Sequence, residues 1–213
     1  MYIHLGHAVG PDIDSLKMTM PVIMGATENH KKSCAKELSI APINKAGIRL
    51  NLLESYDNRG GMGYSTVRKT IAKDMVGPWE LGDEVFHPAD TDIKWIAGHA
   101  SPGPLFPTGF IDIGPGRRVG IINGRSETKK IGEKKIYGHF TAGLFIYDYE
   151  DGKIDWVSPE LFIEDSEAKN ITFASQFIYT GKDEGILYAH VDDSFVRAYT
   201  LNAESIKTLL PKL

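Results

Sequence analysis

The 213-residue chain has a single cysteine, Cys34, so no disulfide can form within it. That thiol has no histidine motif beside it, and we interpret it as an ordinary residue rather than a nucleophile. No apolar run approaches the roughly 20 residues that a membrane-spanning helix needs. The N-terminus also lacks the basic and apolar regions of an export signal. We therefore expect a cytoplasmic protein that does not enter a membrane.

The chain also has no excess of basic residues. The chain carries 24 Lys and Arg against 28 Asp and Glu, a formal net charge of -4, and both signs are spread along it. Because this distribution offers no positive stripe to a polyanion, nucleic acid is not an expected partner. No His, Cys and Asp cluster has the spacing of a zinc site, so the sequence predicts no metal and no cofactor.

Helical periodicity is scarce, and short runs rich in β-branched and aromatic residues take its place. Most of the 22 glycines and 11 prolines fall between these runs, where turns are expected. The exception is 203–210, which follows Asn202 as a possible N-cap and places Ile206, Leu209 and Leu210 on one face. The expected strands are 48–52, 62–67, a short edge strand after Trp79, 93–98, 105–113, 118–124, 140–148, 154–158, 171–179, 186–191 and 195–201.

The first 45 residues are harder to interpret. The runs 2–8 and 20–26 could each be a strand, and 28–37 could be a surface loop or a short helical turn. From 48 onward the alternation is clear, and we expect the turn of the first hairpin at 55–61.

The stretch 171–201 is typical of one unit of a repeating β architecture. Its first turn, Thr180 to Asp183, supplies the positive φ that a tight hairpin needs. Its second turn begins with Asp192 and Asp193. Two adjacent carboxylates between apolar strands do not suit a core, and they point to the mouth of a site.

A chain of this length suits one domain, residues 1–213. Many short antiparallel strands joined by glycine-rich turns favour a β-sandwich or a β-propeller, since both build an all-β core without long helices. The strand pattern alone does not choose between them.

From Gly98 to Leu201 the order and approximate spacing of several short segments resemble one family of carbohydrate enzymes. These segments are SPGPLFPT at 101–108, ING at 122–124, Tyr137, AGLFIYD at 142–148, SPE at 158–160, ITFAS at 171–175 and YAHVDD at 188–193. The series resembles the C-terminal part of the five-bladed β-propeller enzymes of glycoside hydrolase family 130. That family contains mannoside phosphorylases and their hydrolytic relatives.

The resemblance implies an all-β, five-bladed propeller with a short C-terminal helix, acting on mannosides or related β-linked glycans. Where the family's phosphorylases carry a lysine and a histidine associated with phosphate, this chain has Pro107 and Asn123. We therefore expect inverting hydrolysis rather than phosphorolysis, although Arg125 could partly replace the lost basic residues. In that mechanism a carboxylic acid protonates the leaving oxygen while a carboxylate activates water.

Asp193 matches the family's late aspartate and is the expected catalytic residue, with a strand-ending turn as its alternative role. Asp192 and His190 beside it, and His99 in a loop of small residues, are expected to contact substrate or to be ordinary surface residues. Asn123, Arg125 and the aromatic Tyr137 are expected at the same site. The remaining candidates are Asp57 and Arg59, for which a turn is the alternative explanation.

Three other functions stay open. The chain could be a mannoside phosphorylase, or it could bind carbohydrate without catalysis, because the family's early-blade acid cannot be placed in it. The segment ending in Gly77-Pro78-Trp79-Glu80 is similar to arabinosidase and xylosidase propellers, so a pentosidase is the third.

Length bears on assembly. At about 50 residues per blade, this chain supplies about four of five blades. We therefore expect either a ring that is incomplete at its N-terminus and completed by a homo-oligomer, or shortened blades built from 1–45.

Overall fold

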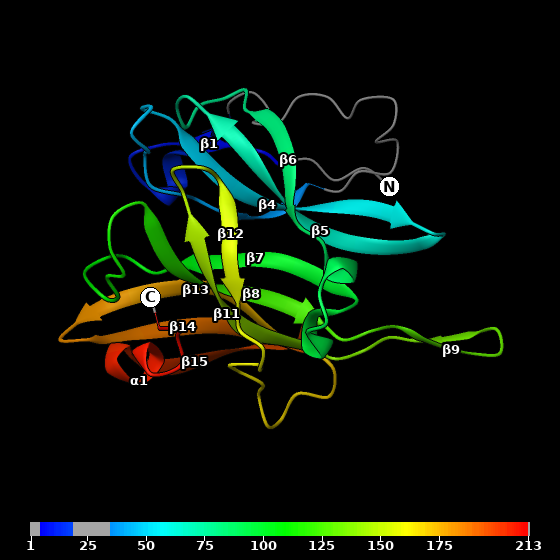
Figure 1. Cartoon of the computed structure of the whole chain (residues 1–213). Helices are drawn as coiled ribbons and strands as arrows, with labels where there is room; N and C mark the ends of the chain where they lie inside the picture. The colour runs from blue at the N-terminus through cyan, green and yellow to red at the C-terminus, as the bar shows by residue number, and fades with distance from the viewer. Residues whose placement is uncertain (1–4, 19–34, 213) are drawn as a thin grey trace.

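The computed structural model describes residues 5–18 and 35–212. Cys34 and the expected strand at 20–26 lie outside these ranges. The elements are almost all strands, with one short α-helix, so the all-β expectation is confirmed (Figure 1). No helix in the described ranges is long and apolar enough to cross a bilayer.

One eight-stranded sheet and one three-stranded sheet make up the body. The eight strands fall into two antiparallel groups, which we call the first and middle sheets, and we call the three-stranded sheet the last sheet. In each of the three, strands that follow one another along the chain are neighbours. The first sheet contains β3 (Lys36–Ser39), β4 (Arg49–Arg59), β5 (Met62–Ala72) and β6 (Glu80–Phe86). The middle sheet contains β7 (His99–Leu105), β8 (Arg117–Arg125), β11 (Phe140–Asp148) and β12 (Lys153–Val157). The last sheet contains β13 (Thr172–Gly181), β14 (Glu184–Val191) and β15 (Phe195–Asn202).

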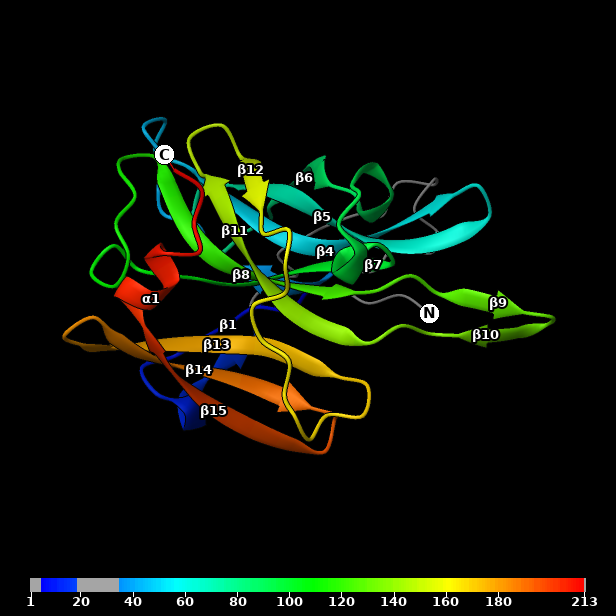
Figure 2. The same ribbon diagram turned by 60° about the horizontal axis from the view of Figure 1, so that its bottom comes forward.

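Smaller elements complete the chain. The β1 (Ala8–Val9) and β2 (Lys17–Met18) strands pair with each other, as do β9 (Lys129–Ile131) and β10 (Lys134–Ile136). Strands β9 and β10 were not predicted from the sequence, and they form an arm that extends beyond the sheets (Figure 2). The short helices are η1 (Ile13–Ser15), η3 (Pro88–Asp90), η4 (Lys94–Ile96) and α1 (Ala203–Lys207).

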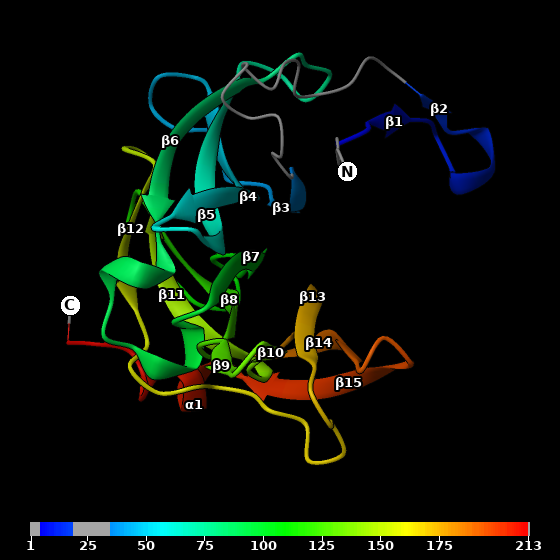
Figure 3. The same cartoon turned by 90° about the vertical axis from the view of Figure 1, so that its right-hand side faces the viewer.

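The sheets follow one another as a fan, and Figure 3 shows them one after the other. A single parallel pair, Ser65 with His99, joins the first sheet to the middle sheet. Strand β7 lies beside both β3 and β13, so the leading strands of the three sheets are neighbours in that order. The described residues form no closed ring of sheets, so five blades stay a prediction.

Two apolar layers hold the fan together. Between the first and middle sheets pack Leu52, Val67, Trp95, Ile122 and Phe145. Between the middle and last sheets pack Phe106, Ile121, Leu144, Leu187 and, from α1, Ile206. Burial of these side chains is the main stabilising term.

Most expected strand positions are confirmed. Strand β11 has the expected bounds, and β8, β12, β13, β14 and β15 differ from expectation by one or two residues at an end. The N-cap of α1 is confirmed too, since Asn202 accepts a hydrogen bond from the Ser205 amide at 3.0 Å. The helix is shorter than expected and ends at Lys207.

Three expectations were wrong. The run 93–98 forms η4 instead of a strand, because that turn places Trp95 and Ile96 in the core. The run 105–113 is mostly a loop with buried aromatic residues, and the strand lies before it, in β7. The first hairpin turn is only Gly60-Gly61, where φ values of 61° and 77° suit glycine. Residues 55–59 continue the strand.

Candidate functional site

A polar cavity lies where the three sheets meet. Its volume is about 270 Å³, close to the lower end of the range for small-molecule sites. The cavity brings His99 together with His190 and Asp193, which lie in one hairpin far along the chain from it. The other lining residues are Lys36, Glu37, Phe140, Ile171 and Phe173. We call this space the junction cavity.

Glu54 lies beneath the junction cavity and was missed by the sequence analysis. Its Oε2 atom is 3.4 Å from His99 Nε2, and its Oε1 atom is 3.4 Å from Lys36 Nζ. Its side chain is only 1% exposed, whereas the Lys36 side chain is 39% exposed. The contact with His99 lacks the alignment of a hydrogen bond. Such loose contacts are common in catalytic sites before substrate binds.

Glu54 is held in its ionised form. Burial on its own would raise the pKa of this carboxyl, but His99, Lys36 and Ser65 together lower it below its ordinary value of 4.5. The local fold explains the arrangement. A register shift between Lys36 and Leu38, with φ of 49° at Glu37, is a β-bulge that interrupts the pairing of β3 with β4 beside Glu54.

A second imidazole and carboxylate pair lies on the other wall. His190 Nδ1 is 3.1 Å from Asp193 Oδ1, and the Asp193 side chain is 74% exposed. Asp193 follows Asp192 in a turn in which both have positive φ, 49° and 52°. Asp193 is therefore a turn residue whose carboxylate also reaches the cavity, so the two roles considered for it are compatible.

Aromatic rings support both imidazoles. His99 meets the edge of Phe140 with ring centres 4.8 Å apart. His190 stacks on Phe173 with centres 5.0 Å apart. These rings hold the imidazoles in place and supply apolar surface beside polar groups. Sugar rings present the same combination of apolar faces and hydroxyl groups.

Arg125 and Tyr137 lie beside the junction cavity. The Arg125 guanidinium is 5.1 Å from the centre of the Tyr137 ring and 5.3 Å from that of Phe140, which lines the cavity. Tyr137 is 61% exposed. Both were expected at the site, and the structure places them next to it.

Asn123 and Asp192, which were expected to contact substrate, are both hydrogen-bonded to the backbone. The Asn123 side chain is fully buried, and its amide bonds to the backbone of Ala174 in both directions, at 2.7 and 2.9 Å. Asp192 accepts backbone N–H bonds from Lys169, Asn170 and Ile171, at 2.7 to 2.9 Å. These bonds lower its pKa. Both side chains are therefore held by the backbone, and neither lines the junction cavity.

Asp57 and Arg59 lie in another group of charges. Asp57 Oδ2 is 3.2 Å from His87 Nε2, and Arg59 bonds Asp90 at 2.5 Å and approaches Glu84 at 3.7 Å. They do not line the junction cavity. On β4 they alternate with Glu54 and point to the other face of the strand.

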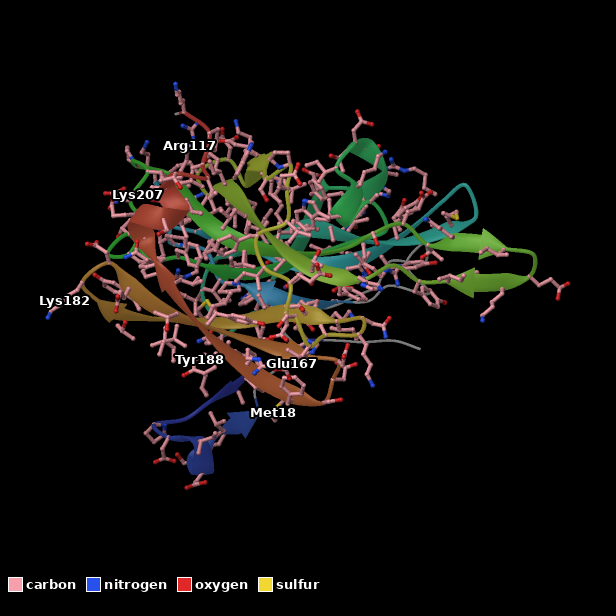
Figure 4. The ribbon with its side chains drawn as sticks, turned by 90° about the horizontal axis from the view of Figure 1, so that it is seen from below. Met18, Arg117, Glu167, Lys182, Tyr188 and Lys207 are labelled. Atoms are coloured by element: carbon pink, nitrogen blue, oxygen red, sulfur yellow. The ribbon has the colours of Figure 1, made fainter. Side chains whose placement is uncertain are left out.

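The other large aromatic residues differ in burial. Trp79, Trp95 and Tyr147 belong to the core. Trp95 lies so close to Gly124 and Gly143 that an added Cβ would come within 2.5 and 2.2 Å of its ring. Tyr188 is only partly buried and extends from the outer face of the last sheet (Figure 4).

One sequence signal could have revealed Glu54. Leu50 and Leu52 establish a buried face, and a residue two positions further along a strand shares that face. A buried carboxylate must be paired, so this position could have been predicted as a site residue.

Across residues 5–18 and 35–212, no group of His, Cys, Asp and Glu side chains is placed to hold a metal ion.

Solved structures provide the comparison with known proteins. No family model and no curated protein matches the sequence. A glycosyl hydrolase from Bacteroides ovatus is 17% identical, with a TM-score of 0.65 over 92% of this chain and 57% of its own. This chain therefore spans little more than half the length of that structure.

Two further structures are similar at lower scores. One comes from work on the family 130 mannoside phosphorylases, described as containing glycoside hydrolases that target β-1,2-mannosidic linkages in Candida mannan. It is 15% identical, with a TM-score of 0.50 over 94% of this chain and 76% of its own. The other is an RGII complex of BT0996, at 14% identity, with a TM-score of 0.50 over 80% of this chain and 53% of its own. The chain thus shares its fold with a glycosyl hydrolase and a structure from the family 130 work, as the sequence resemblance implied.

Proposed function

We propose that this chain processes glycosides, by hydrolysis, at the junction cavity. The observation that carries the proposal is the convergence of two imidazole and carboxylate pairs, Glu54 with His99 and His190 with Asp193. Aromatic rings lie beside both pairs. The shared fold with a glycosyl hydrolase supports the same reaction class.

The residues have different roles in the proposed reaction. Asp193, exposed at the rim, accepts a proton from the water that attacks the anomeric carbon. The bond from that carbon to the leaving oxygen breaks, and the leaving oxygen takes up a proton. His99, in contact with ionised Glu54, is the candidate donor of that proton. Glu54 is too buried to contact a sugar, so it acts by positioning His99.

Mannosides or related β-linked glycans remain the proposed substrates. Phosphorolysis is less well supported, because Asn123 is bonded to the backbone of Ala174 and does not line the junction cavity. Incubation of the purified protein with manno-oligosaccharides and pentosides, with and without phosphate, tests the reaction class. Free reducing sugar without phosphate is the expected product, and a sugar phosphate would contradict hydrolysis.

Carbohydrate binding without turnover is the second candidate. It is favoured by the open fan, since the described sheets do not close a ring around the cavity. Calorimetric binding of a glycan that is never cleaved, across a broad panel, would select this candidate.

Asp193→Asn tests the catalytic role directly. The change removes the charge and keeps the shape, so loss of a base should lower turnover by roughly 100-fold or more. The thermal midpoint should change little, because the carboxylate is largely exposed.

Asp183→Asn is the matched control. Asp183 has φ of 63° in the turn at the other end of β14, next to Lys182, which is labelled at the tip of the last sheet in Figure 4. It does not line the junction cavity, so its turnover should equal that of the unmodified protein. Undiminished turnover in a destabilised Asp193→Asn variant would remove Asp193 from the mechanism.

A further inference from the structure

Arg125 stands at the end of β8, where the chain leaves the middle sheet for the β9–β10 arm. It lines two hollows, one on each side of the arm. The larger, of about 620 Å³, includes Arg125, Lys134, Lys135, Tyr137, Phe140 and Ile171. We call it the arm groove. It shares Phe140 and Ile171 with the junction cavity, so a ligand can extend from one into the other.

The Arg125 guanidinium uses few of its donors. Its Nη2 atom donates to the Gly98 carbonyl at 3.3 Å, and its Nε atom is buried without a hydrogen-bond partner. In the described part of the chain no carboxylate pairs with it. By contrast, Arg117 and Arg197 each bond an aspartate at 2.9 Å. A planar fork with spare donors is suited to binding an oxyanion through two hydrogen bonds.

The cation is also only partly hydrated. Tyr137 and Phe140 stack against it, and burial lowers its pKa, a shift that Tyr137 and the more distant Glu54 partly oppose. This guanidinium has lost part of its hydration and has no carboxylate partner among the described residues. Binding of an anionic ligand would therefore be favourable.

The surrounding charge favours an anion as well. Residues 125–137 contain five basic side chains and two acidic ones, in a chain whose net charge is -4. Lys134 and Lys135 line the arm groove itself, and the arm that carries them stands clear of the sheets (Figures 1 and 2). Glu127 lines the hollow on the other side of the arm and not the arm groove.

We propose that the arm groove binds the carboxylate of an acidic sugar, a uronic acid residue, in the glycan that enters the junction cavity. Arg125 receives the carboxylate through its fork, Tyr137 covers the guanidinium, and the arm lysines add long-range attraction. This proposal rests on the proposed function and narrows its substrate class to acidic glycans.

Binding measurements test this without requiring turnover. Calorimetry would compare four ligands: a glucuronic acid trisaccharide, its methyl ester, a neutral manno-trisaccharide and inorganic phosphate. We expect the acid to bind at least 10-fold more tightly than its ester, and the difference to shrink as salt is raised. Arg125→Gln should abolish the preference while leaving ester binding within about twofold, and Arg125→Lys should keep part of it.

Arg118→Gln is the matched control, because Arg118 lies on the same strand, stacks on Tyr149 at 5.0 Å and donates to a backbone carbonyl. It does not line the arm groove, so the preference for the acid should persist. Equal binding of acid and ester, or an unchanged preference in Arg125→Gln with an unchanged thermal midpoint, would overturn the proposal. Phosphate bound more tightly than the acid would reassign Arg125 to phosphate. Cleavage of neutral glycans without a preference for the acidic glycan would contradict this inference alone. Absence of binding to any saccharide would contradict the proposed function as well.

Discussion

Two sets of polar groups differ in how they are paired: Asn123 and Asp192 with their backbone partners, which we call the joint, and the polar groups of the junction cavity. At the joint, the Asn123 amide is bonded to Ala174 on both sides, and Asp192 accepts three backbone N–H groups. At the cavity, His99 Nε2 and His190 Nδ1 lie near carboxylates without aligned hydrogen bonds.

This difference separates stability from function. A buried polar group with all its bonds made contributes to a unique fold and has nothing left for a ligand. Buried polar groups with loose or missing partners reduce the stability of the fold. They are found at sites where a ligand can supply the missing hydrogen bonds. Asp192 and Asp193 show the contrast in two adjacent residues.

The strongest test of the comparison is Glu54→Gln, which removes the buried charge of the cavity. Turnover should fall by roughly 100-fold, since a positioning carboxylate is lost from His99. Asp83, a carboxylate that is 89% exposed and makes one ion pair, provides the control, and Asp83→Asn should leave turnover unchanged.

Glu54→Gln also has a pH signature. The pKa of Glu54 is lowered in the folded state, so its ionisation stabilises the fold above its ordinary value of 4.5. That contribution is lost as the pH falls through the lowered pKa, and the variant should lack this loss. Chemical denaturation at a series of pH values measures it, and identical slopes for both proteins would show that Glu54 is not held ionised.

Asn123→Ala should lower the stability of the fold without changing turnover. The free energy of unfolding should fall by about 2–4 kcal/mol, because the Ala174 N–H and C=O would both be buried without partners. Turnover per folded molecule should stay the same.

Urea denaturation compares this variant with Gln176→Ala, a change of an exposed residue on the same strand as Ala174. Reduced turnover in fully folded Asn123→Ala would return Asn123 to the substrate site.

Asp192→Asn should have the smallest effect. The carboxylate accepts three backbone N–H bonds that lower its pKa below the ordinary value of 3.8. Its contribution to stability is therefore present above pH 3.8 and is lost as the pH falls through the lowered pKa. The variant should melt slightly below the unmodified protein at neutral pH, and the gap should close in acid. A constant gap in thermal scans from pH 3 to 7 would contradict this account.

Local sequence was sufficient for most of the fold. Strand β11 and the hairpins of the last sheet follow from β-branched runs that end at residues able to adopt positive φ, such as Asp183 and Asp193. Prediction from local sequence failed at 93–98, because Trp95 packs against Gly124 and Gly143 on other strands. No local pattern contains that contact.

At the site, local sequence predicts that Asp193 lies in a turn beside His190, because both belong to one hairpin. The position of His99 opposite that hairpin, its contact with Glu54, and the backbone bonds of Asn123 and Asp192 depend on tertiary contacts. The physical reason is that turn geometry depends on neighbouring residues. The pairing of a buried charge depends on strands brought together by the burial of apolar side chains between sheets.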